Sequence, residues 1–308
     1  MNSYYPENSF FGKAKFHPLF IIIFGLSLSI TFITAIDIMV AKLSYPILGV
    51  SYEDYNHALT KENIPYQYLL FFIFRLSIIQ ILGFGLTGWL LAHSANDWKK
   101  ELFFDNNFFS KKVVWAGLIM IVSIPFYQVF MITPEQAAEF LSSEDLKLLK
   151  SIEEQSEKLL MQIMKTNLLF NILIFAVFPA ICEEIFFRGF LFQNLNRFTN
   201  VFWSIFFSSL IFSLLHFQIY GFFVRLIMGA MLAFFFYFGK SIHTAIFAHF
   251  INNFFTTFVS WLALNGFISK EITHQNYQFH YLIVLSSFIL TAIFTYLYYQ
   301  SYQNEKLR

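Results

Sequence analysis

Five polar side chains lie within apolar stretches of this chain that are long enough to sit in a lipid bilayer: Glu183, Glu184, His216, His249 and Asn253. An ionisable side chain at membrane depth is costly unless it faces a partner or a wet cavity, so each one marks a possible functional site. Carboxylates and imidazoles are also the groups that activate water and move protons. The sequence therefore indicates a membrane protein with acid–base chemistry buried inside it.

The composition agrees with a membrane protein. Hydrophobic residues make up 57% of the chain and charged residues 13%, whereas soluble domains carry roughly 25% charged residues. The net charge of +1 is spread without basic clusters, so no nucleic-acid partner is indicated. Cys182 is the one cysteine, which excludes an intramolecular disulfide and a CxxC metal site.

The apolar segments predict the fold class. A spanning helix needs about 20 mostly apolar residues. We count eight such segments, which predict an all-α, polytopic transmembrane bundle, over residues 19–40, 66–91, 113–132, 168–192, 201–217, 221–238, 242–264 and 281–299.

The lysines and arginines of the short loops predict the orientation. One side holds most of them: Lys13, Lys15, Lys99, Lys100, Lys111, Lys112, Arg197, Lys240, Lys306 and Arg308. This side is predicted to be cytoplasmic, in a bacterial inner membrane, with both termini inside. Eight spans require the termini to share a side, which agrees. Water is expected to reach the site from the cytoplasmic face.

We expect one integral membrane domain with three parts. Residues 1–165 hold three spans and an amphipathic surface helix, 166–265 form a four-span core, and 266–308 form the last span and tail. Within 134–165, Ser142 precedes acidic residues and an apolar stripe, which is typical of a capped amphipathic helix. It is either a solvated connector or a lid over a cavity. The aromatic segment 102–109 is expected to anchor at the membrane interface.

Helical spacing separates the two adjacent carboxylates. Glu184 and Arg188 are four residues apart, so they share a helix face and are expected to form an internal ion pair. Glu183 points about 100° away. It is left without a cation of its own, and the unpaired carboxylate should be the better proton acceptor. The alternative is that both acids lie in the headgroup region.

His216 and His249 are expected at a depth in the membrane similar to that of Glu183. Glu183 and His216 each lie about 25 Å along the helix from the turn near Thr199, so antiparallel neighbours would let them share a water. His249 and Asn253 are four apart on one face of a later span. The alternatives are an interfacial or packing role for His216 and interhelical hydrogen bonding for Asn253.

The ordered motifs resemble those of the CPBP intramembrane proteases, a group that includes Ras-converting CAAX endoproteases and bacteriocin-processing or abortive-infection-type proteins. They are EExxxR (Glu183, Glu184 and Arg188), FxxxH (Phe212 and His216) and HxxxN (His249 and Asn253). The resemblance covers about residues 168–264. It implies an intramembrane endopeptidase in which Glu183 and His216 activate the attacking water, and His249 and Asn253 stabilise the oxyanion. Glu184 and Arg188 would hold the site together, and Phe212 would pack beneath His216.

The sequence leaves two alternatives for the cofactor, either none or a zinc ion. We favour metal-free chemistry, because asparagine is a poor zinc ligand and a good oxyanion donor. A set of Glu183, His216 and His249 could instead bind zinc, since three protein ligands and a water form the usual catalytic pattern. The chain has no HExxH helix.

The expected substrate is a membrane-associated protein or peptide, such as a lipidated CAAX-like tail or a leader peptide. The alternative functions are a non-catalytic immunity or scaffold protein of the same fold and, less favoured, a proton-coupled transporter. Arg75 and Arg225 could bind a substrate carboxylate, although intramembrane arginines more often pair internally, and Asp37 is the other acid in an early span.

Overall fold

The computed structural model describes residues 5, 9–13, 16–61, 63–95, 110–132, 136, 142–269 and 279–306. Within these ranges 86% of the residues are helical and none forms a strand, which confirms the all-α class. The aromatic segment 102–109, and most of residues 133–141 in the segment before the amphipathic helix, lie outside the described residues.

Each of the eight predicted spans coincides with a helix. They are α2 (Pro18–Leu48), the continuous helix α4–η1–α5 (Tyr66–Ala95), α7 (Lys111–Tyr127), the continuous helix α10–η3–α11–η4–α12 (Leu168–Phe198), α13 (Val201–Leu214), α14 (Phe222–Gly239), α15 (Ile242–Leu264) and α16 (Tyr281–Lys306).

Five of these helices are long and apolar enough to cross a membrane by length and composition: Pro18–Leu48, Tyr66–Ala95, Leu168–Phe198, Phe222–Gly239 and Tyr281–Asn304. Of the other three, α7 has 17 residues and α13 has 14. The third, α15, carries two histidines and two asparagines. The chain is thus a polytopic bundle, and the count of eight spans stays a prediction.

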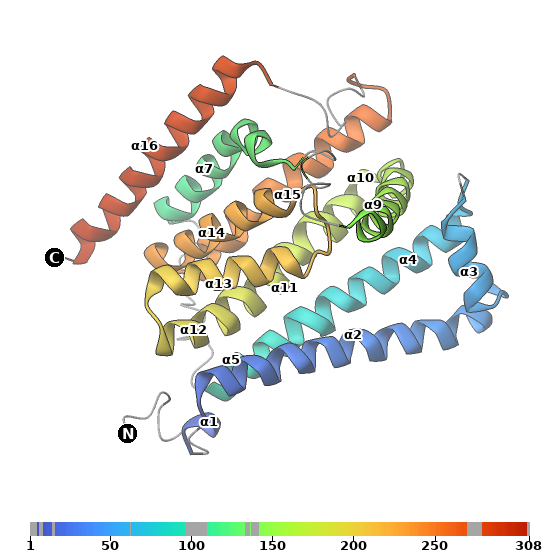
Figure 1. The fold of residues 1–308 in the computed structure, drawn as a ribbon, viewed down its shortest axis with the longest axis horizontal. Coiled ribbons are helices and arrows are strands. Elements are labelled where there is room, and N and C mark those ends of the chain that lie inside the picture. Colours follow the sequence, from blue (N-terminus) through green and yellow to red (C-terminus); the bar gives the residue numbers. More distant parts are fainter. Residues whose placement is uncertain are drawn as a thin grey trace.

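The helices run alternately in opposite directions (Figure 1). In that view α1 (Phe10–Lys13), the turn between α12 (Gln193–Phe198) and α13, and the C-terminal end of α16 lie at the left end of the bundle. The helix α3 (Tyr52–Leu59) lies at the opposite end, and the turn between the short helix α13 and α14 lies near the middle of the bundle (Figure 1). Helices of all three predicted parts pack together, since α7 contacts both α15 and α16, and α5 (Thr87–Ala95) contacts η4. The division into three parts stays a prediction.

Three stretches of the two longest interior helices are π-helical: η1 (Ile79–Leu86), η3 (Leu173–Val177) and η4 (Ile185–Phe192). Such widened turns free backbone carbonyls, which in a membrane need another donor. In η1 the Ser29 hydroxyl donates to the Gly83 carbonyl at 2.6 Å, and the Thr87 hydroxyl donates to the Leu82 carbonyl at 2.9 Å. The stretches η1 and η4 begin beside the residues of the candidate site.

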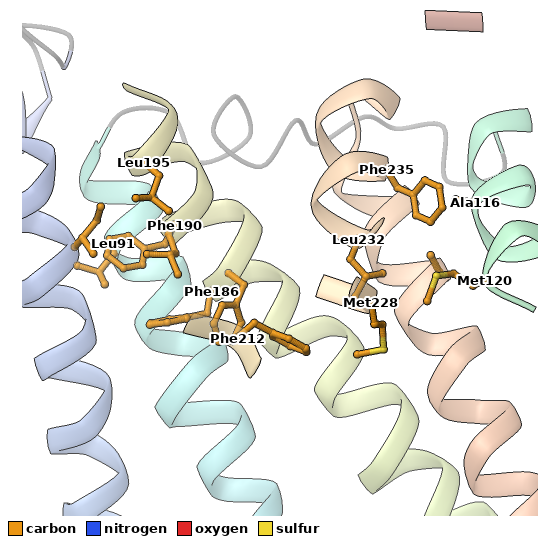
Figure 2. Close-up of a cluster of buried hydrophobic side chains, with 14 of the residues drawn as sticks. Leu91, Ala116, Met120, Phe186, Phe190, Leu195, Phe212, Met228, Leu232 and Phe235 are labelled. Atoms are coloured by element: carbon orange, nitrogen blue, oxygen red, sulfur yellow. The ribbon is translucent and has the colours of Figure 1, made fainter. Parts of the chain in front are cut away.

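Aromatic side chains fill the space between the helices (Figure 2). Phe186, Phe190 and Phe212 belong to one buried cluster that extends from α5 to α14 (Figure 2). Between membrane helices the drive to associate comes from close packing, because lipid is as apolar as the side chains themselves. Gly229 allows one such close contact: a Cβ there would lie 3.1 Å from the Cβ of Ser209, so α13 and α14 approach closely.

The amphipathic helix α9 (Ser143–Met164) begins where the sequence predicts. The Ser142 hydroxyl accepts the backbone N–H of Asp145 at 3.1 Å. Figure 1 shows α9 end-on, roughly perpendicular to the spanning helices. Ile163 is fully buried, and Gln162 accepts the backbone N–H of Ile64 at 2.9 Å. One face of α9 therefore packs against the bundle, unlike a connector that is solvated all round.

Candidate active site

Glu184 joins three helical segments through one carboxylate oxygen. Its Oε1 accepts Nη1 of Arg188 at 2.8 Å, which is the ion pair that the spacing predicts. The same oxygen bonds Nδ1 of His249 at 2.8 Å. The Arg188 guanidinium also donates from Nη2 to the Gly229 carbonyl at 2.8 Å. These contacts link α11 (Phe178–Glu184), η4, α14 and α15.

The contact with Glu184 fixes which way the His249 ring is protonated. An ionised carboxylate paired with arginine only accepts hydrogen bonds, so Nδ1 of His249 must be the donor. In the neutral ring Nε2 is then an acceptor, and it becomes a donor when the ring is doubly protonated. That Nε2 lies 4.0 Å from Oε2 of Glu183. His249 is thus oriented by one glutamate and faces the other.

Glu183 is 6% exposed and, among the described residues, forms no ion pair with arginine or lysine, as the sequence predicts. Its Oε1 accepts a hydrogen bond from Nε2 of Gln80 at 3.0 Å. Gln80 belongs to η1, in a span that carries none of the three motifs. The signal that could have identified it is a lone glutamine inside an apolar span, which needs a partner there.

His216 lies in the turn just after α13, because the helix predicted to reach residue 217 ends at Leu214. Its Nδ1 is 2.7 Å from the Phe212 carbonyl, so Nδ1 donates and Nε2 is the acceptor of the neutral ring. The imidazole interacts electrostatically with Glu183 and with His249. Phe217 follows with a left-handed φ of 51°, which turns the chain sharply next to His216. The structure thus gathers Glu183, His216 and His249 in one place.

The Phe212 ring packs against several residues of this cluster. Its fully buried ring lies 4.8 Å from the His216 ring and 6.0 Å from the His249 ring, measured between centroids. The Arg188 guanidinium lies 5.2 Å from the same ring. Packing of Phe212 beneath His216, expected from the family motif, is present.

Asn253 lies one turn after His249 on α15, and its Oδ1 accepts Nδ2 of Asn252 at 3.2 Å. The Asn253 side chain is thus held by its neighbour in the chain. In the described residues no hydrogen bond joins Asn253 to Glu183 or His249, so its oxyanion role stays a prediction.

Arg75 and Arg225 both have internal partners. Arg75 pairs with Asp37 through Nε and Oδ1 at 2.8 Å. Arg225 donates from Nη1 to the side chain of Gln218 at 2.8 Å and from Nη2 to its backbone carbonyl at 2.7 Å. The internal alternative is therefore the one that the structure favours for both.

A cavity of about 830 Å³ opens beside the His216 turn. Its lining is mostly apolar and comes from residues 129–132 after α7, the end of α13 and the turn that follows it, the start of α14, and Leu149 of α9. The side of the membrane from which water reaches this cavity stays a prediction.

The possible zinc ligands are Glu183, His216 and His249. Among the described residues, no three histidine, cysteine, aspartate or glutamate side chains are grouped so that they could hold a metal ion. The separation of 4.0 Å between His249 and Glu183 is wider than the ~3.4 Å that two ligands about 2.1 Å from a tetrahedral zinc would show. The side chains would have to move together to bind zinc as a set.

Residues 165–255 match the family model described as Rce1-like, type II CAAX prenyl endopeptidase. The matched segment contains all three motifs and ends just after Asn253, so it confirms the resemblance inferred from them. Searches of curated proteins and of solved structures returned no significant match. The family match and the apolar helices support an integral membrane protease that acts on a peptide substrate.

Proposed function

From the match of residues 165–255 to Rce1-like endopeptidases, we propose that this chain hydrolyses a peptide bond in a membrane-associated substrate, with Glu183 as the base that activates water. The observation that carries the proposal is the arrangement of two carboxylates around one imidazole. Glu184 holds Nδ1 of His249, and Glu183 faces Nε2. This leaves one carboxylate with a structural task and the other available to a reacting water.

The reaction begins with proton transfer. Oε2 of Glu183 takes a proton from a water molecule while the water oxygen bonds to the carbonyl carbon of the substrate. Nε2 of His216 is an acceptor in the neutral ring, so it can hold the second hydrogen of that water and orient it. Glu183 then returns its proton to the amide nitrogen as the carbon–nitrogen bond breaks. The base is restored, and a carboxylic acid and an amine are released.

Negative charge develops on the carbonyl oxygen during attack. We assign its stabilisation to Nε2 of His249 and the Asn253 amide. Donation from Nε2 requires the doubly protonated ring, because Nδ1 already donates to Glu184. The Glu184 carboxylate would then stabilise the imidazolium, as the carboxylate does in hydrolytic triads. Arg188 holds Glu184 in place through their ion pair.

The substrate is expected to carry an apolar group, such as a lipidated CAAX-like tail or the hydrophobic part of a leader peptide. The support is the mostly apolar cavity of about 830 Å³ beside His216. Buried binding sites of this size usually combine an apolar lining with a few polar groups that fix orientation.

The orientation follows from the basic residues. Lys13, Lys111, Arg197 and Lys240 belong to the end of the bundle that carries α1 and the end of α16 (Figure 1). By the positive-inside rule this end is cytoplasmic. We propose that the membrane is a bacterial inner membrane and that water reaches the site from this cytoplasmic face.

The test compares membrane proteomes. Cells with the wild-type protein, with Glu183→Gln and with Glu53→Gln would be searched for peptides cut only when the protein is active. Gln keeps the shape of Glu183 but cannot accept the proton, so cleavage should fall by at least about 100-fold. Glu53 lies exposed on α3 (Tyr52–Leu59), and its replacement should leave cleavage unchanged. Equal cleavage by Glu183→Gln would refute the assignment of the base.

The same preparations decide the metal question. We propose metal-free chemistry, so purified wild-type protein should stay active after exhaustive chelation. A zinc enzyme would instead contain stoichiometric zinc, lose it in His249→Ala and lose activity on chelation. That result would make Glu183, His216 and His249 zinc ligands and would contradict the catalytic roles proposed for them above.

A further inference from the structure

Gln80 touches the proposed base from outside the family-matched segment. Its Nε2 donates to Oε1 of Glu183 at 3.0 Å. An ionised carboxylate only accepts hydrogen bonds, so the amide nitrogen must be the atom that faces it. The family match covers residues 165–255, and Gln80 lies in the second span, 103 residues before its partner. The contact therefore depends on the tertiary structure, because it joins residues of two different spans.

Close helix packing brings Gln80 to this place. A Cβ on Gly88 would lie 2.7 Å from the Cα of Phe186, so the two backbones touch where α5 meets η4. A Cβ on Gly85 would lie 3.0 Å from Sγ of Cys182, the residue before Glu183. Side chains larger than hydrogen at these two positions would push the helices apart and carry Gln80 away from Glu183.

The side-chain amide of Gln80 is incompletely hydrogen-bonded. Oε1 of Gln80 is buried without a hydrogen-bond partner in the described structure. A half-satisfied amide between apolar helices is unfavourable, and the π-helical stretch η1 that carries it is itself a less stable form of helix. Features of this kind tend to be kept where a side chain must be aimed at a reacting group.

We propose that Gln80 is a positioning residue for the peptide hydrolysis assigned above, and the inference rests on that function. Gln80 holds one oxygen of Glu183, so the other oxygen points toward Nε2 of His249 and the reacting water. The hydrogen bond also stabilises the ionised carboxylate, which is the form that accepts the proton. Gln80 itself does not touch the reacting atoms.

The ionisable groups that face Glu183 come from three helical segments and from the turn after α13. His249 on α15 lies 4.0 Å away. His216 after α13, Arg188 on η4 and Cys182 on α11 interact with Glu183 electrostatically. These groups remain when Gln80 is replaced, so a change in pH dependence in a Gln80 variant reports the lost hydrogen bond.

The experiment measures kcat, KM and the pH–rate profile of purified Gln80→Met with a peptide substrate identified by the proteomic comparison. Met keeps the length of the side chain but cannot donate. We expect kcat to fall about 10- to 100-fold, the usual effect of losing a hydrogen-bonding partner behind a reacting group, with KM unchanged. The acidic limb should move to higher pH by about one unit, a tenfold change in the protonation equilibrium.

Two further variants complete the test. Gln67→Met makes the same change on an exposed position of α4 (Tyr66–Ile78) and should behave as wild type. Gln80→His can still donate from Nε2 and should recover part of kcat. If Gln80→Met does not fold, Gln80→Asn, whose amide is too short to reach Glu183, takes its place.

The outcomes separate the inference from the proposed function. If the wild type cleaves and Glu183→Gln does not, the function stands. An unchanged kcat and acidic limb in Gln80→Met would then overturn the role of Gln80 alone. If the wild type does not cleave, the proposed function fails and the positioning role fails with it.

Discussion

At the residue scale, the central feature is a buried cluster of charges that is incompletely hydrogen-bonded. The side chains of Glu184 and Arg188 are both 0% exposed. Oε2 of Glu184 and Nε of Arg188 have no hydrogen-bond partner in the described residues. A buried pair of this kind adds little net stability, but removal of one partner leaves the other charge uncompensated. Its value lies in fixing the position of His249.

The first prediction at this scale concerns coupling between Glu184 and Arg188. Glu184→Ala and Arg188→Ala should each lower the free energy of unfolding by about 3–5 kcal/mol, and the double variant should lose clearly less than the sum. Glu184→Ala should also lower activity more than Arg188→Ala does, because Glu184 alone holds Nδ1 of His249. Chemical unfolding in detergent measures the first effect and peptide cleavage the second.

The control is the exposed pair Lys150 and Glu154, four residues apart on α9 with Nζ and Oε1 at 3.9 Å. Their coupling should be below about 0.5 kcal/mol, since solvent screens exposed pairs. Equal and small coupling in both pairs would contradict the ion-pair interpretation of Glu184 and Arg188.

At the element scale, α9 contributes to the wall of the cavity and is attached to the turn beside it. Leu149 lines the cavity, and Oε1 of Glu153 accepts the backbone N–H of Tyr220 at 3.3 Å. Tyr220 belongs to the turn that follows His216 and precedes α14. Arg225 is attracted to the same carboxylate. The helix is thus attached to the segment that carries a proposed catalytic residue, which favours the lid alternative over a connector.

The prediction for α9 follows from the titration of Glu153. Burial raises the pKa of its carboxyl, against the opposing effects of the Tyr220 N–H and Arg225. A carboxyl whose pKa is raised in the docked state favours docking when protonated. Docking should therefore be strongest below the ordinary carboxyl pKa of about 4.3 and weaken as pH rises through the raised value.

Hydrogen exchange of residues 143–164, corrected for intrinsic exchange rates, measures this effect. Glu153→Gln should make protection of α9 independent of pH in this range. Glu154→Gln, an exposed neighbour on the same helix, should keep the wild-type pH dependence. A pH dependence that persists in Glu153→Gln would show that another group controls docking.

At the scale of the whole molecule, the prediction of eight alternating spans places the two ends of the bundle on opposite sides of a membrane. His93 lies exposed near the end of α5, which contacts α1. His57 lies exposed on α3 (Tyr52–Leu59), at the opposite end of the bundle (Figure 1). The two positions therefore report the two sides.

The corresponding prediction uses cysteine labelling. In a Cys182→Ala background, His93→Cys and His57→Cys should react with a membrane-impermeant thiol reagent from opposite sides. With cytoplasmic termini, His57→Cys should react from outside and His93→Cys from inside. Reaction of both from one side would contradict the arrangement of spans, and exchange of the two sides would invert the proposed orientation.

The sequence by itself determined the features that depend on local spacing. Long apolar segments predicted where the spanning helices lie, because the bilayer demands length and apolarity from each one separately. A separation of four residues predicted the pair of Glu184 and Arg188, because helical geometry fixes such neighbours. The three motifs identified the segment that the family match then confirmed. The end of α13 before His216 was missed, because the apolar pattern continues past Leu214.

Only the tertiary structure decided which partners meet across helices. The contact of His249 with Glu184 joins residues 65 apart, and that of Gln80 with Glu183 joins residues 103 apart. Such contacts depend on the rotation and approach of helices, which are set by packing at positions such as Gly88 and Gly229. The cavity was likewise decided there, because residues 129–132 and residues of α9, α13 and α14 must meet to enclose it. Helical periodicity fixes where a side chain points on its own helix, but only packing fixes what it faces.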